Sequence, residues 1–322
     1  MVVTVTINPL LEKYLRYPTV HAGAQHRNPE VVYKSGGKGV NVSRQLKHLG
    51  IHSTAMLFLG GDRGRHLKKI IDAEGIETVP VRSKAETRLA TIAEDTQEQN
   101  LYTFFEENPV ITEQEAEEFC DRLDKVIANS EIMVFSGSSP SPAADIIFPY
   151  GIKKTIDEGK VAIVDTYGSH LKACIDASPT ILHANRQELQ TSLGLNPETD
   201  EAYAEVLTML YQKGVKQSYI TNGKDTGYAA QFDYHYRFMS SAVHQLDATG
   251  SGDAFLSGII HGWYYDNPFD EFLPLAMALG AANAASLEVC RVPMEEAEKI
   301  VKECRIEPFG KKMRLVDVTP TA

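Results

Sequence analysis

The amino-acid sequence predicts an α/β fold in which a mostly parallel sheet is flanked by helices and carries a small β-sheet lid. Three observations indicate this class. Short β-branched or apolar runs alternate with longer helical patterns along almost all of the 322 residues, which is typical of a parallel sheet covered on both faces. Polar residues follow directly after several of the predicted strands. Two stretches break the alternation and lack a convincing helical pattern.

The alternating part of the chain predicts the main sheet and its helices. Strands are expected at residues 2–7, 54–59, 132–136, 161–165, 181–184 and 218–221. Helical patterns lie between or after them, at residues 40–49, 64–74, 113–129, 144–158, 201–213 and 293–304. No fixed-period repeat and no low-complexity linker interrupts the series. We therefore expect one main α/β domain formed by residues 1–9, 36–86 and 108–322.

The two irregular stretches, residues 10–35 and 87–107, predict the lid. The first contains the short run Val31, Val32 and Tyr33 but no helical pattern, and the second reads as two strands around a polar turn at 95–100. A small sheet over the mouth of the main one would shield a reactive group from water. Because pairing protects exposed strand edges, the lid is also where we expect a homodimer to form.

Composition excludes several classes of protein. The formal net charge is −11 and no Lys/Arg-rich run is present, which disfavours nucleic acid as the main partner. The most apolar stretch, residues 273–289, is interrupted by Gly280, Asn283 and Ser286, so no membrane partner is expected. The cysteines are scattered, with no Cys-x-x-Cys pair, and the chain starts without a basic leader, which predicts a cytoplasmic protein (Cys120, Cys174, Cys290 and Cys304).

The most informative motif is the turn Gly250-Ser251-Gly252, which leads into Asp253 and an apolar helical pattern. Unpaired N–H groups at a helix N-terminus favour an anion, and a carboxylate beside them can accept a proton from an attacking hydroxyl. This arrangement suits phosphoryl transfer to an alcohol. The alternative is a tight loop whose aspartate only caps the following helix.

A second glycine-rich element, Gly36-Gly37-Lys38-Gly39, also opens a helical pattern and is followed by Asn41. The glycine amides can approach a ligand closely, while Lys38 can reach an anion and Asn41 a hydroxyl. It matches neither a Walker A loop nor a Rossmann fingerprint. A purely structural loop is the alternative.

Polar residues gather where predicted strands end, and ligands of open α/β sheets bind at that edge. They are Asn8, Ser136, Gly137, Ser138, Asp165, Asn185, Thr221, Asn222 and Gly223. Asn185-x-x-Glu188 could hold hydrated Mg²⁺, although Asn185 could equally be a helix cap. Arg88, at the start of the second lid segment, has the fork that suits a phosphate, or it is simply solvated. The histidines His183, His244 and His261 form no ligand-spaced set and are interpreted as structural.

These motifs resemble the ribokinase/PfkB family of carbohydrate kinases over nearly the whole chain. The two signatures are GGKGVNVSRQLKHLG at 36–50 and DATGSGDAFLSG at 247–258, in the family's order. The resemblance implies a ribokinase-like fold with a β-lid, ATP as donor and Mg²⁺. It implies that Asp253 is the catalytic base and that Gly250, Ser251 and Gly252 form the anion hole.

The resemblance also assigns binding residues. Asn185 and Glu188 match a motif that acts through Mg²⁺ and water, so Glu188 is the expected metal residue. The expected nucleotide residues are Asn185, Thr221, Gly223, Gly227 and Asn283. The N-terminal half is most similar to the phosphosugar kinases of the 1-phosphofructokinase and tagatose-6-phosphate kinase type. This implies that the substrate is held by Glu12, Gly37, Lys38, Asn41, Arg88 and Ser138, with Lys38, Asn41, Arg88 and Ser138 on its phosphate.

Four departures from the family pattern bear on the substrate. Glu12 stands where the branch usually has Asp, His183 replaces a lysine, and the nucleotide loop is one residue longer between Gly223 and Gly227. Thr249 is more typical of kinases for unphosphorylated substrates. These departures leave the reaction class standing, and the resemblance implies an ATP-dependent kinase that converts a ketohexose monophosphate, of the fructose 1-phosphate or tagatose 6-phosphate type, to a bisphosphate. The alternatives are a kinase of an unphosphorylated sugar or nucleoside, and a sugar-phosphate sensor with weak catalysis.

Overall fold

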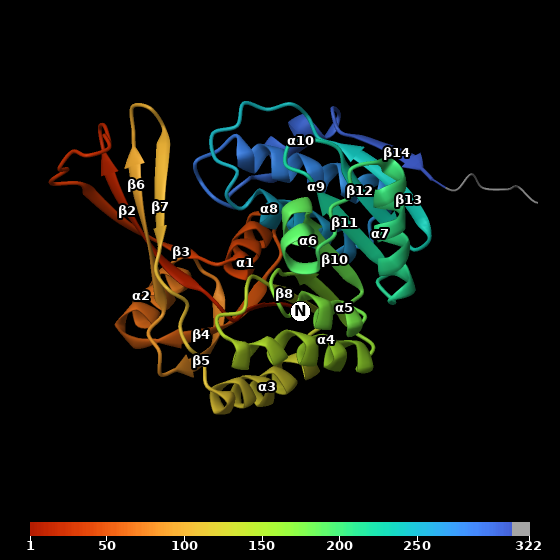
Figure 1. Cartoon of the computed structure of the whole chain (residues 1–322), viewed down its shortest axis with the longest axis horizontal. Coiled ribbons are helices and arrows are strands. Elements are labelled where there is room, and N and C mark those ends of the chain that lie inside the picture. Colours follow the sequence, from red (N-terminus) through yellow and green to blue (C-terminus); the bar gives the residue numbers. More distant parts are fainter. Residues whose placement is uncertain (311–322) are drawn as a thin grey trace, which may run out of the picture.

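A computed structural model describes residues 1–310 of the chain. Its strands form a ten-stranded sheet and a separate four-stranded sheet. Figure 1 shows the smaller sheet standing off one side of the α/β body, with its strands β2, β6 and β7 extending away from it. This is the α/β architecture with a small additional sheet that the alternation of patterns predicts.

The larger sheet has the order β14-β13-β12-β11-β10-β9-β8-β1-β4-β5. The strands from β5 to β11 along this order are parallel, and β11 to β14 continue as an antiparallel edge. The bounds are β1 Val2–Thr6, β4 Ser53–Gly60, β5 Glu77–Ser83, β8 Ile132–Ser136, β9 Val161–Asp165, β10 Ile181–Asn185, β11 Gln217–Thr221, β12 Gly227–Gln231, β13 Tyr234–Met239 and β14 Arg305–Phe309.

Helices cover both faces of this sheet, which explains why its central strands are buried along their whole length. Successive residues of β1 and β8 belong alternately to two cores: Val3 and Met133 pack with α3, α4, α5 and α7, whereas Val2 and Ile132 pack with α1, α8 and α9. The helices are α1 Lys38–His48, α2 Gly61–Ala73, α3 Glu113–Ala128, η1 Pro142–Ile146, α4 Ile147–Asp157, α5 Leu171–Asp176, α6 Arg186–Leu193, α7 Asp200–Gln212, α8 Ser251–Tyr264, α9 Phe269–Ala284 and α10 Met294–Val301.

The smaller sheet has the order β3-β2-β6-β7 and draws its strands from both irregular stretches. Its strands are β2 Leu10–Tyr17, β3 Glu30–Gly36, β6 Arg88–Asp95 and β7 Asn100–Phe105. Strands β2 and β6 run parallel, so Leu10 lies beside Arg88 at the root of the sheet. That this sheet moves as a lid stays a prediction.

The predicted strands and helices are all present, with ends shifted by a few residues. The helix predicted at 144–158 is divided, because Pro142–Ile146 forms a 3-10 turn before α4 begins. The sequence patterns missed β5, β12, β13 and β14. Strand β12 has the sequence GYAAQ, whose Gly and Ala residues give little strand signal. The antiparallel edge of the sheet was therefore not predicted.

Candidate active site

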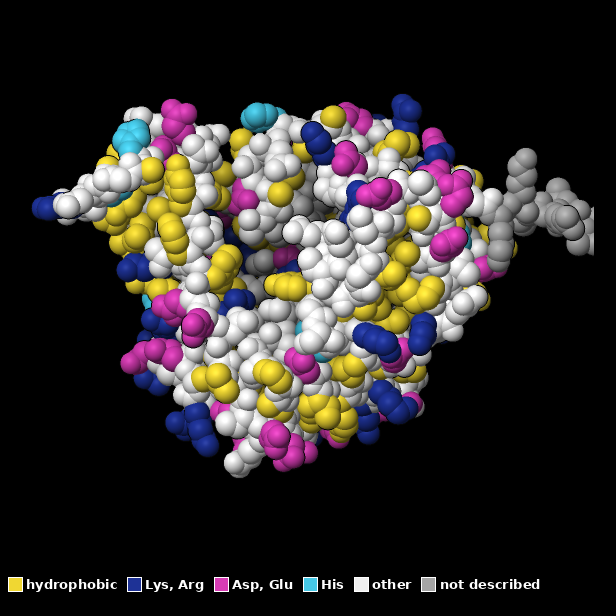
Figure 2. All heavy atoms as spheres, in the orientation of Figure 1, with side chains coloured by type: hydrophobic (Ala, Val, Ile, Leu, Met, Phe, Trp, Pro, Cys, Tyr) yellow, Lys and Arg dark blue, Asp and Glu magenta, His cyan; other side chains and the backbone are white. Residues whose placement is uncertain are grey.

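A cleft of about 1110 Å³ lies between the root of the smaller sheet and the carboxyl ends of the parallel strands. Figure 2 shows it as a deep hollow between the two parts of the molecule. Residues just beyond β1, β8, β9, β10 and β11 contribute to its wall, as expected for an open α/β sheet; they include Asn8, Ser138, Tyr167, Arg186 and Asn222.

Most of the site residues expected from the sequence share this one cleft. It is lined by Glu12, Gly37, Lys38, Asn41, Arg88, Ser138, Asn185, Glu188, Thr221, Gly223, Gly250, Ser251, Gly252 and Asp253. Two expected nucleotide residues do not line it. Gly227 begins β12 and lies against the ring of Phe238, and Asn283 is buried behind the loop that precedes α8. The cleft therefore unites both glycine-rich elements, which are more than 200 residues apart.

Asp253 lies in the first turn of α8 and is 5% exposed. Its Oδ2 accepts a hydrogen bond from Asn41 Nδ2 at 2.8 Å. Burial, followed by the nearby carboxylate of Asp165, raises the pKa of Asp253 to about 7, against the opposing effects of Lys38 and Asn41. A carboxyl group with a pKa near neutrality is suited to general base catalysis.

The loop before α8 adopts a shape that requires glycine. Gly250 is the N-cap residue and has φ 76°, in the left-handed region that favours glycine. A side chain there would also meet Val289, whose Cγ1 lies 2.4 Å from the position of a Cβ. The Ser251 N–H donates to the carbonyl of Ala248 at 3.1 Å. The N–H groups of Gly252 and Asp253 belong to the first helical turn, which has no intrahelical acceptor for them.

Lys38 lies at the start of α1 and is held by two carboxylates. Its Nζ is 3.0 Å from Asp165 Oδ1 and 2.7 Å from Glu188 Oε1. Asp165 is completely buried, and the opposing charge of Lys38, followed by that of His183, holds the pKa of its carboxyl well below the usual range despite that burial. The structure thus places the Lys38 ammonium between Asp165 at the end of β9 and Glu188 in α6. The expected contact of Lys38 with a phosphate of the substrate stays a prediction.

Arg88 stands at the root of the smaller sheet in a cluster of polar side chains. It donates to the carbonyl of Asn8 and to Asn108 Oδ1, both at 3.2 Å. Asn8 Nδ2 in turn donates to Asn108 Oδ1 and to Ser138 Oγ, both at 3.0 Å. Among the described residues, the buried Arg88 Nε has no hydrogen-bond partner. Burial lowers the pKa of Arg88, but a guanidinium remains charged at neutral pH, so this N–H is a charged donor without a protein acceptor among those residues.

Glu12 projects into the cleft from β2. Burial raises the pKa of its carboxyl, although Arg44 and Lys34 lie near enough to oppose that effect. The Tyr14 hydroxyl donates to Glu12 Oε2 at 3.4 Å. The extra methylene relative to aspartate is therefore accommodated, and the carboxylate still faces the cleft.

Asn185 and Glu188 form a capping box at the start of α6. The Glu188 N–H donates to Asn185 Oδ1 at 2.8 Å, and Glu188 Oε2 accepts from the Asn185 N–H at 2.9 Å. The helix cap, which the sequence analysis gave as the alternative role of Asn185, is thus present at the start of α6. It also fixes Glu188, whose other oxygen, Oε1, contacts Lys38.

His183 was interpreted from the sequence as structural, but it lies in the cleft wall. Its Nδ1 is 3.2 Å from Asp165 Oδ1 and its Nε2 is 3.3 Å from Thr221 Oγ1. The imidazole joins the buried carboxylate to the end of β11. The departure from the usual lysine at this position therefore changes a group that faces the ligand site.

Asn283 acts on the site through the loop it holds. Its Nδ2 donates to the Thr249 carbonyl at 2.8 Å and to Ser251 Oγ at 3.1 Å, and its Oδ1 accepts from the Cys290 N–H at 2.7 Å. It is 1% exposed. These contacts fix the backbone on either side of Gly250.

Sequence reasoning missed three contributors to the site. Asp165 was noted as a polar strand end but was assigned no role, and only its distance from Lys38 shows its importance. Asn108 follows the second irregular stretch and carried no signal. Arg44 lies inside the first signature, in α1, and no sequence pattern distinguishes it from the other residues of that helix.

Within residues 1–310, no group of three or more His, Cys, Asp and Glu side chains is arranged to hold a metal ion. The same residues contain no helix long and apolar enough to cross a membrane. A magnesium ion in this cleft would accordingly need oxygen atoms of a ligand or of water besides those of the protein.

The chain belongs to the pfkB family of carbohydrate kinases, since the family model matches residues 6–296. A curated relative, the tagatose-6-phosphate kinase of Staphylococcus epidermidis, is 25% identical over 312 residues, which cover 95% of this chain and 99% of that relative.

Solved structures of the same fold agree. A possible 1-phosphofructokinase from Thermotoga maritima superposes with a TM-score of 0.86 at 21% identity, covering 96% of this chain and 99% of that one. The tetrameric inhibited form of phosphofructokinase-2 from Escherichia coli gives a TM-score of 0.84 at 21% identity, covering 94% and 98%. The predicted family and fold class are thereby confirmed.

The raised pKa of Asp253 predicts a cost of keeping its charge in the folded protein. Between its ordinary value of 3.8 and about 7 the folded state binds the proton more tightly than the unfolded chain does, so stability falls as pH rises through that range. We expect Asp253→Asn to raise the midpoint of thermal unfolding at pH 8 by roughly 3–8 °C. Differential scanning calorimetry should find that this gain shrinks as the pH is lowered from 7 to 5.

Asp176→Asn is the matched control, because Lys172 and Lys213 lower the pKa of Asp176 to about 2. That variant should show no gain at pH 8. A gain for Asp253→Asn that is independent of pH would contradict the assignment of a buried, strained charge to this position.

Proposed function

We propose that this protein transfers the terminal phosphoryl group of ATP to a hydroxyl of a ketohexose monophosphate, which yields a bisphosphate and ADP. The observation that carries the proposal is the pairing, in one cleft, of Asp253 at a helix N-terminus with Arg88 and its unpartnered N–H. The first supplies a base beside an anion site, and the second a cation for a phosphate already on the substrate.

The chemistry follows from Asp253 and the helix on which it stands. As the substrate hydroxyl oxygen bonds to the γ-phosphorus of ATP, the bond from that phosphorus to the β-phosphate oxygen breaks, and the hydroxyl proton passes to the Asp253 carboxylate. The N–H groups of Gly252 and Asp253, in the first turn of α8, would stabilise the negative charge that gathers on the transferred group. Asn41 orients the carboxylate, and the separate sheet excludes water from the reaction.

The two substrates would bind at opposite ends of the cleft. Arg88 and Ser138, with Asn8 behind them, would hold the existing phosphate, and Glu12 would accept hydrogen bonds from sugar hydroxyls. Asn185, Thr221 and Gly223 would contact the nucleotide. Lys38, between Asp165 and Glu188, is near enough to Asp253 to influence its pKa and would move onto the phosphates as they arrive.

Mg²⁺ fits the donor set at this end of the cleft. Glu188 presents a carboxylate to the cleft, and Mg²⁺ characteristically binds one or two carboxylates together with water and substrate phosphates. Glu188 would hold the ion through water. When bound, the ion supplies neutralisation of charge on the donor phosphates.

The names of the relatives support a phosphorylated acceptor, since they act on tagatose 6-phosphate or are described as phosphofructokinases. Thr249 favours a second candidate, a kinase of an unphosphorylated sugar or nucleoside. The Thr249 N–H donates to Asp247, and the Thr249 carbonyl accepts from Asn283. These contacts fix the loop beside the expected position of the sugar substrate. The third candidate, a sugar-phosphate sensor with weak catalysis, is favoured only by the departures from the family pattern at Glu12 and His183.

A substrate panel tests the proposal. ADP release in a coupled assay with Mg-ATP should occur with one or more of fructose 1-phosphate, tagatose 6-phosphate and fructose 6-phosphate. Fructose and ribose should give rates at least about 100-fold lower, because without a phosphate they leave the Arg88 cluster unpaired. Turnover confined to fructose or ribose would favour the second candidate. Binding of sugar phosphates without ADP release would favour the sensor.

Variants separate the two parts of the site. Asp253→Ala should lower kcat by about 10³-fold or more with little change in ligand binding, because only the transition state uses the base. Arg88→Ala should mainly raise KM for the sugar phosphate, by about 10–100-fold. Steady-state kinetics and titration calorimetry measure both. Arg82→Ala, an exposed arginine on β5, is the control that should leave both constants unchanged. Near-normal turnover by Asp253→Ala would refute the mechanism.

We also propose that the smaller sheet pairs with that of a second copy. The pairing register places Val31, Leu15, Ala93 and Tyr102 in one row across the sheet, and Tyr33, Lys13, Thr91 and Phe104 in the next row of the same face. Phe104 is 63% exposed, and Val31 and Tyr102 are also exposed. Figure 2 shows hydrophobic side chains along this sheet. An exposed apolar face on a sheet with two edge strands, β3 and β7, is suited to packing against the same face of a second copy.

The pairing predicts a dimer or a higher oligomer in solution. Light scattering after size-exclusion chromatography should give at least twice the chain mass for the natural protein. Tyr102→Glu should shift the equilibrium toward monomer by at least about tenfold, since a charge is then buried against apolar side chains. Tyr211→Glu, which changes an exposed tyrosine on α7, should leave the mass unchanged. A natural protein that is monomeric at micromolar concentration would exclude the pairing.

A further inference from the structure

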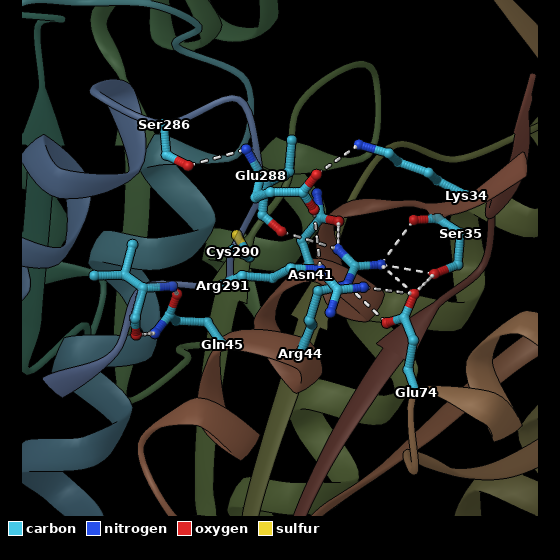
Figure 3. A network of polar contacts seen from close by, with 12 residues as sticks. Lys34, Ser35, Asn41, Arg44, Gln45, Glu74, Ser286, Glu288, Cys290 and Arg291 are labelled. Carbon is cyan, nitrogen blue, oxygen red and sulfur yellow. Dashed lines mark hydrogen bonds and ion pairs between the residues drawn. The ribbon is translucent and has the colours of Figure 1, made fainter. Parts of the chain in front are cut away.

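Arg44, on the second turn of α1, is the centre of a buried polar network at the back of the cleft. The residue is 5% exposed. Figure 3 shows its guanidinium between Asn41 on one side and Ser35 and Glu74 on the other. Its Nε donates to Glu74 Oε2 at 2.7 Å, and its Nη2 donates to the Ser35 carbonyl at 2.8 Å and to Ser35 Oγ at 2.6 Å.

The remaining arm of the guanidinium reaches toward the catalytic end. Arg44 Nη1 donates to Asn41 Oδ1 at 2.8 Å and to the carbonyl of Val289 at 3.4 Å. Asn41 Nδ2 then donates to Asp253 Oδ2 at 2.8 Å. A continuous chain of hydrogen bonds therefore runs from Glu74, at the end of α2, through Arg44 and Asn41 to the carboxylate of Asp253.

The chemistry of these groups leaves Asn41 only one orientation. Guanidinium has donors but no acceptor, so it must face the amide oxygen of Asn41. The amide NH₂ then faces Asp253, where an ionised carboxylate can only accept. Without Arg44 the amide could turn by half a rotation and present its oxygen to the carboxylate, an arrangement of two acceptors that repel each other.

We propose that Arg44 is a positioning residue for phosphoryl transfer: it fixes the Asn41 amide, which in turn fixes the carboxylate of Asp253. The inference rests on the proposed function, because it takes Asp253 as the base. Arg44 does not line the large cleft and acts only through Asn41. It belongs instead to a smaller crevice that shares Glu12 and Asn41 with the cleft.

Arg44 is itself fixed from three elements. Glu74 follows α2, Ser35 belongs to β3 of the smaller sheet, and Val289 belongs to the loop that packs on Gly250. Ser35 Oγ also donates to Glu74 Oε1 at 2.8 Å, which closes the ring of contacts. Lysine has one ammonium in place of the planar fork, and it cannot satisfy Glu74, Ser35 and Asn41 in this geometry.

Kinetics of Arg44→Met, Arg44→Lys, Asn41→Ala and the double variant Arg44→Met/Asn41→Ala test the role. Each Arg44 variant should lower kcat with the sugar phosphate by about 10–100-fold, because the base is displaced from its attack geometry. KM for ATP should stay within about twofold, since the hydrogen bonds of Arg44 go to Glu74, Ser35, Asn41 and Val289 and none to an expected nucleotide residue. The double variant should be no slower than Asn41→Ala alone, because Arg44 acts through that amide.

A merely structural role gives a different pattern. Arg237→Met is the matched control, because Arg237 also bridges two carboxylates, Asp200 and Glu307, but lies on β13 outside the cleft. It should lower the unfolding midpoint while kcat per folded molecule is unchanged. If the folded Arg44 variants behave in this way, or if the effects of Arg44→Met and Asn41→Ala on kcat multiply, the positioning role is overturned.

Two further variants keep the outcomes separable. If neither Arg44 variant folds, Glu74→Ala decides, since it leaves Arg44 in place and removes the carboxylate that holds it: a lowered kcat with unchanged KM for ATP supports the role, and an unchanged kcat overturns it. Asp253→Ala is measured alongside. An active Asp253→Ala enzyme refutes Asp253 as the base, on which the inference rests, and a natural protein that releases no ADP with any sugar phosphate refutes the proposed function. An inactive Asp253→Ala enzyme with normal Arg44 variants refutes only the positioning role.

Discussion

The arrangement of the cleft depends on the neutralisation of buried carboxylates by one lysine. Asp165 and Asp253 are both buried, and removing such charges from water costs several kcal/mol for each ion unless a partner compensates. Lys38 contacts Asp165 and Glu188 directly and opposes the raised pKa of Asp253. The glycine-rich turn before α1 is what brings this ammonium to the ends of β9 and β10. Lys38 is thus the cation that offsets the repulsion among the carboxylates of Asp165, Glu188 and Asp253.

Lys38 stabilises the charges of Asp165 and Asp253 to different extents, and this difference moves the pKa values of the two carboxyl groups in opposite directions. Asp165 contacts both Lys38 and His183 directly. It stays ionised, because these contacts hold the pKa of its carboxyl well below the usual range. Asp253 makes no direct ion pair with Lys38, so its burial, followed by the nearby charge of Asp165, raises its pKa to about 7. One aspartate is thus a permanent charge, and the other is able to exchange a proton near neutral pH.

Much of the fold followed from sequence because its signals are local. Alternation of strand and helix patterns predicted the parallel core, and polar residues at strand ends predicted the cleft edge. Strand β12 was missed because it is rich in small residues. The site residues found from sequence lie within the two glycine-rich motifs or in short polar motifs. Those missed, Asn108 and Arg44, act through partners distant in sequence or through another side chain, and no local pattern encodes such a contact.

The parallel pairing of β2 with β6 gives the smaller sheet a root beside the cleft and a tip at its opposite end. Its register puts Glu12 beside Ala90 and Arg88 beside Leu10, both near the point where the chain leaves the main sheet. The connections at 18–29 and 96–99 lie at the opposite end. Lengthening such loops costs little closure entropy. Insertion of a peptide tag or fluorophore at the tip is thus an engineering route that leaves the ligand-facing registers intact, whereas the same insertion at the root would displace them.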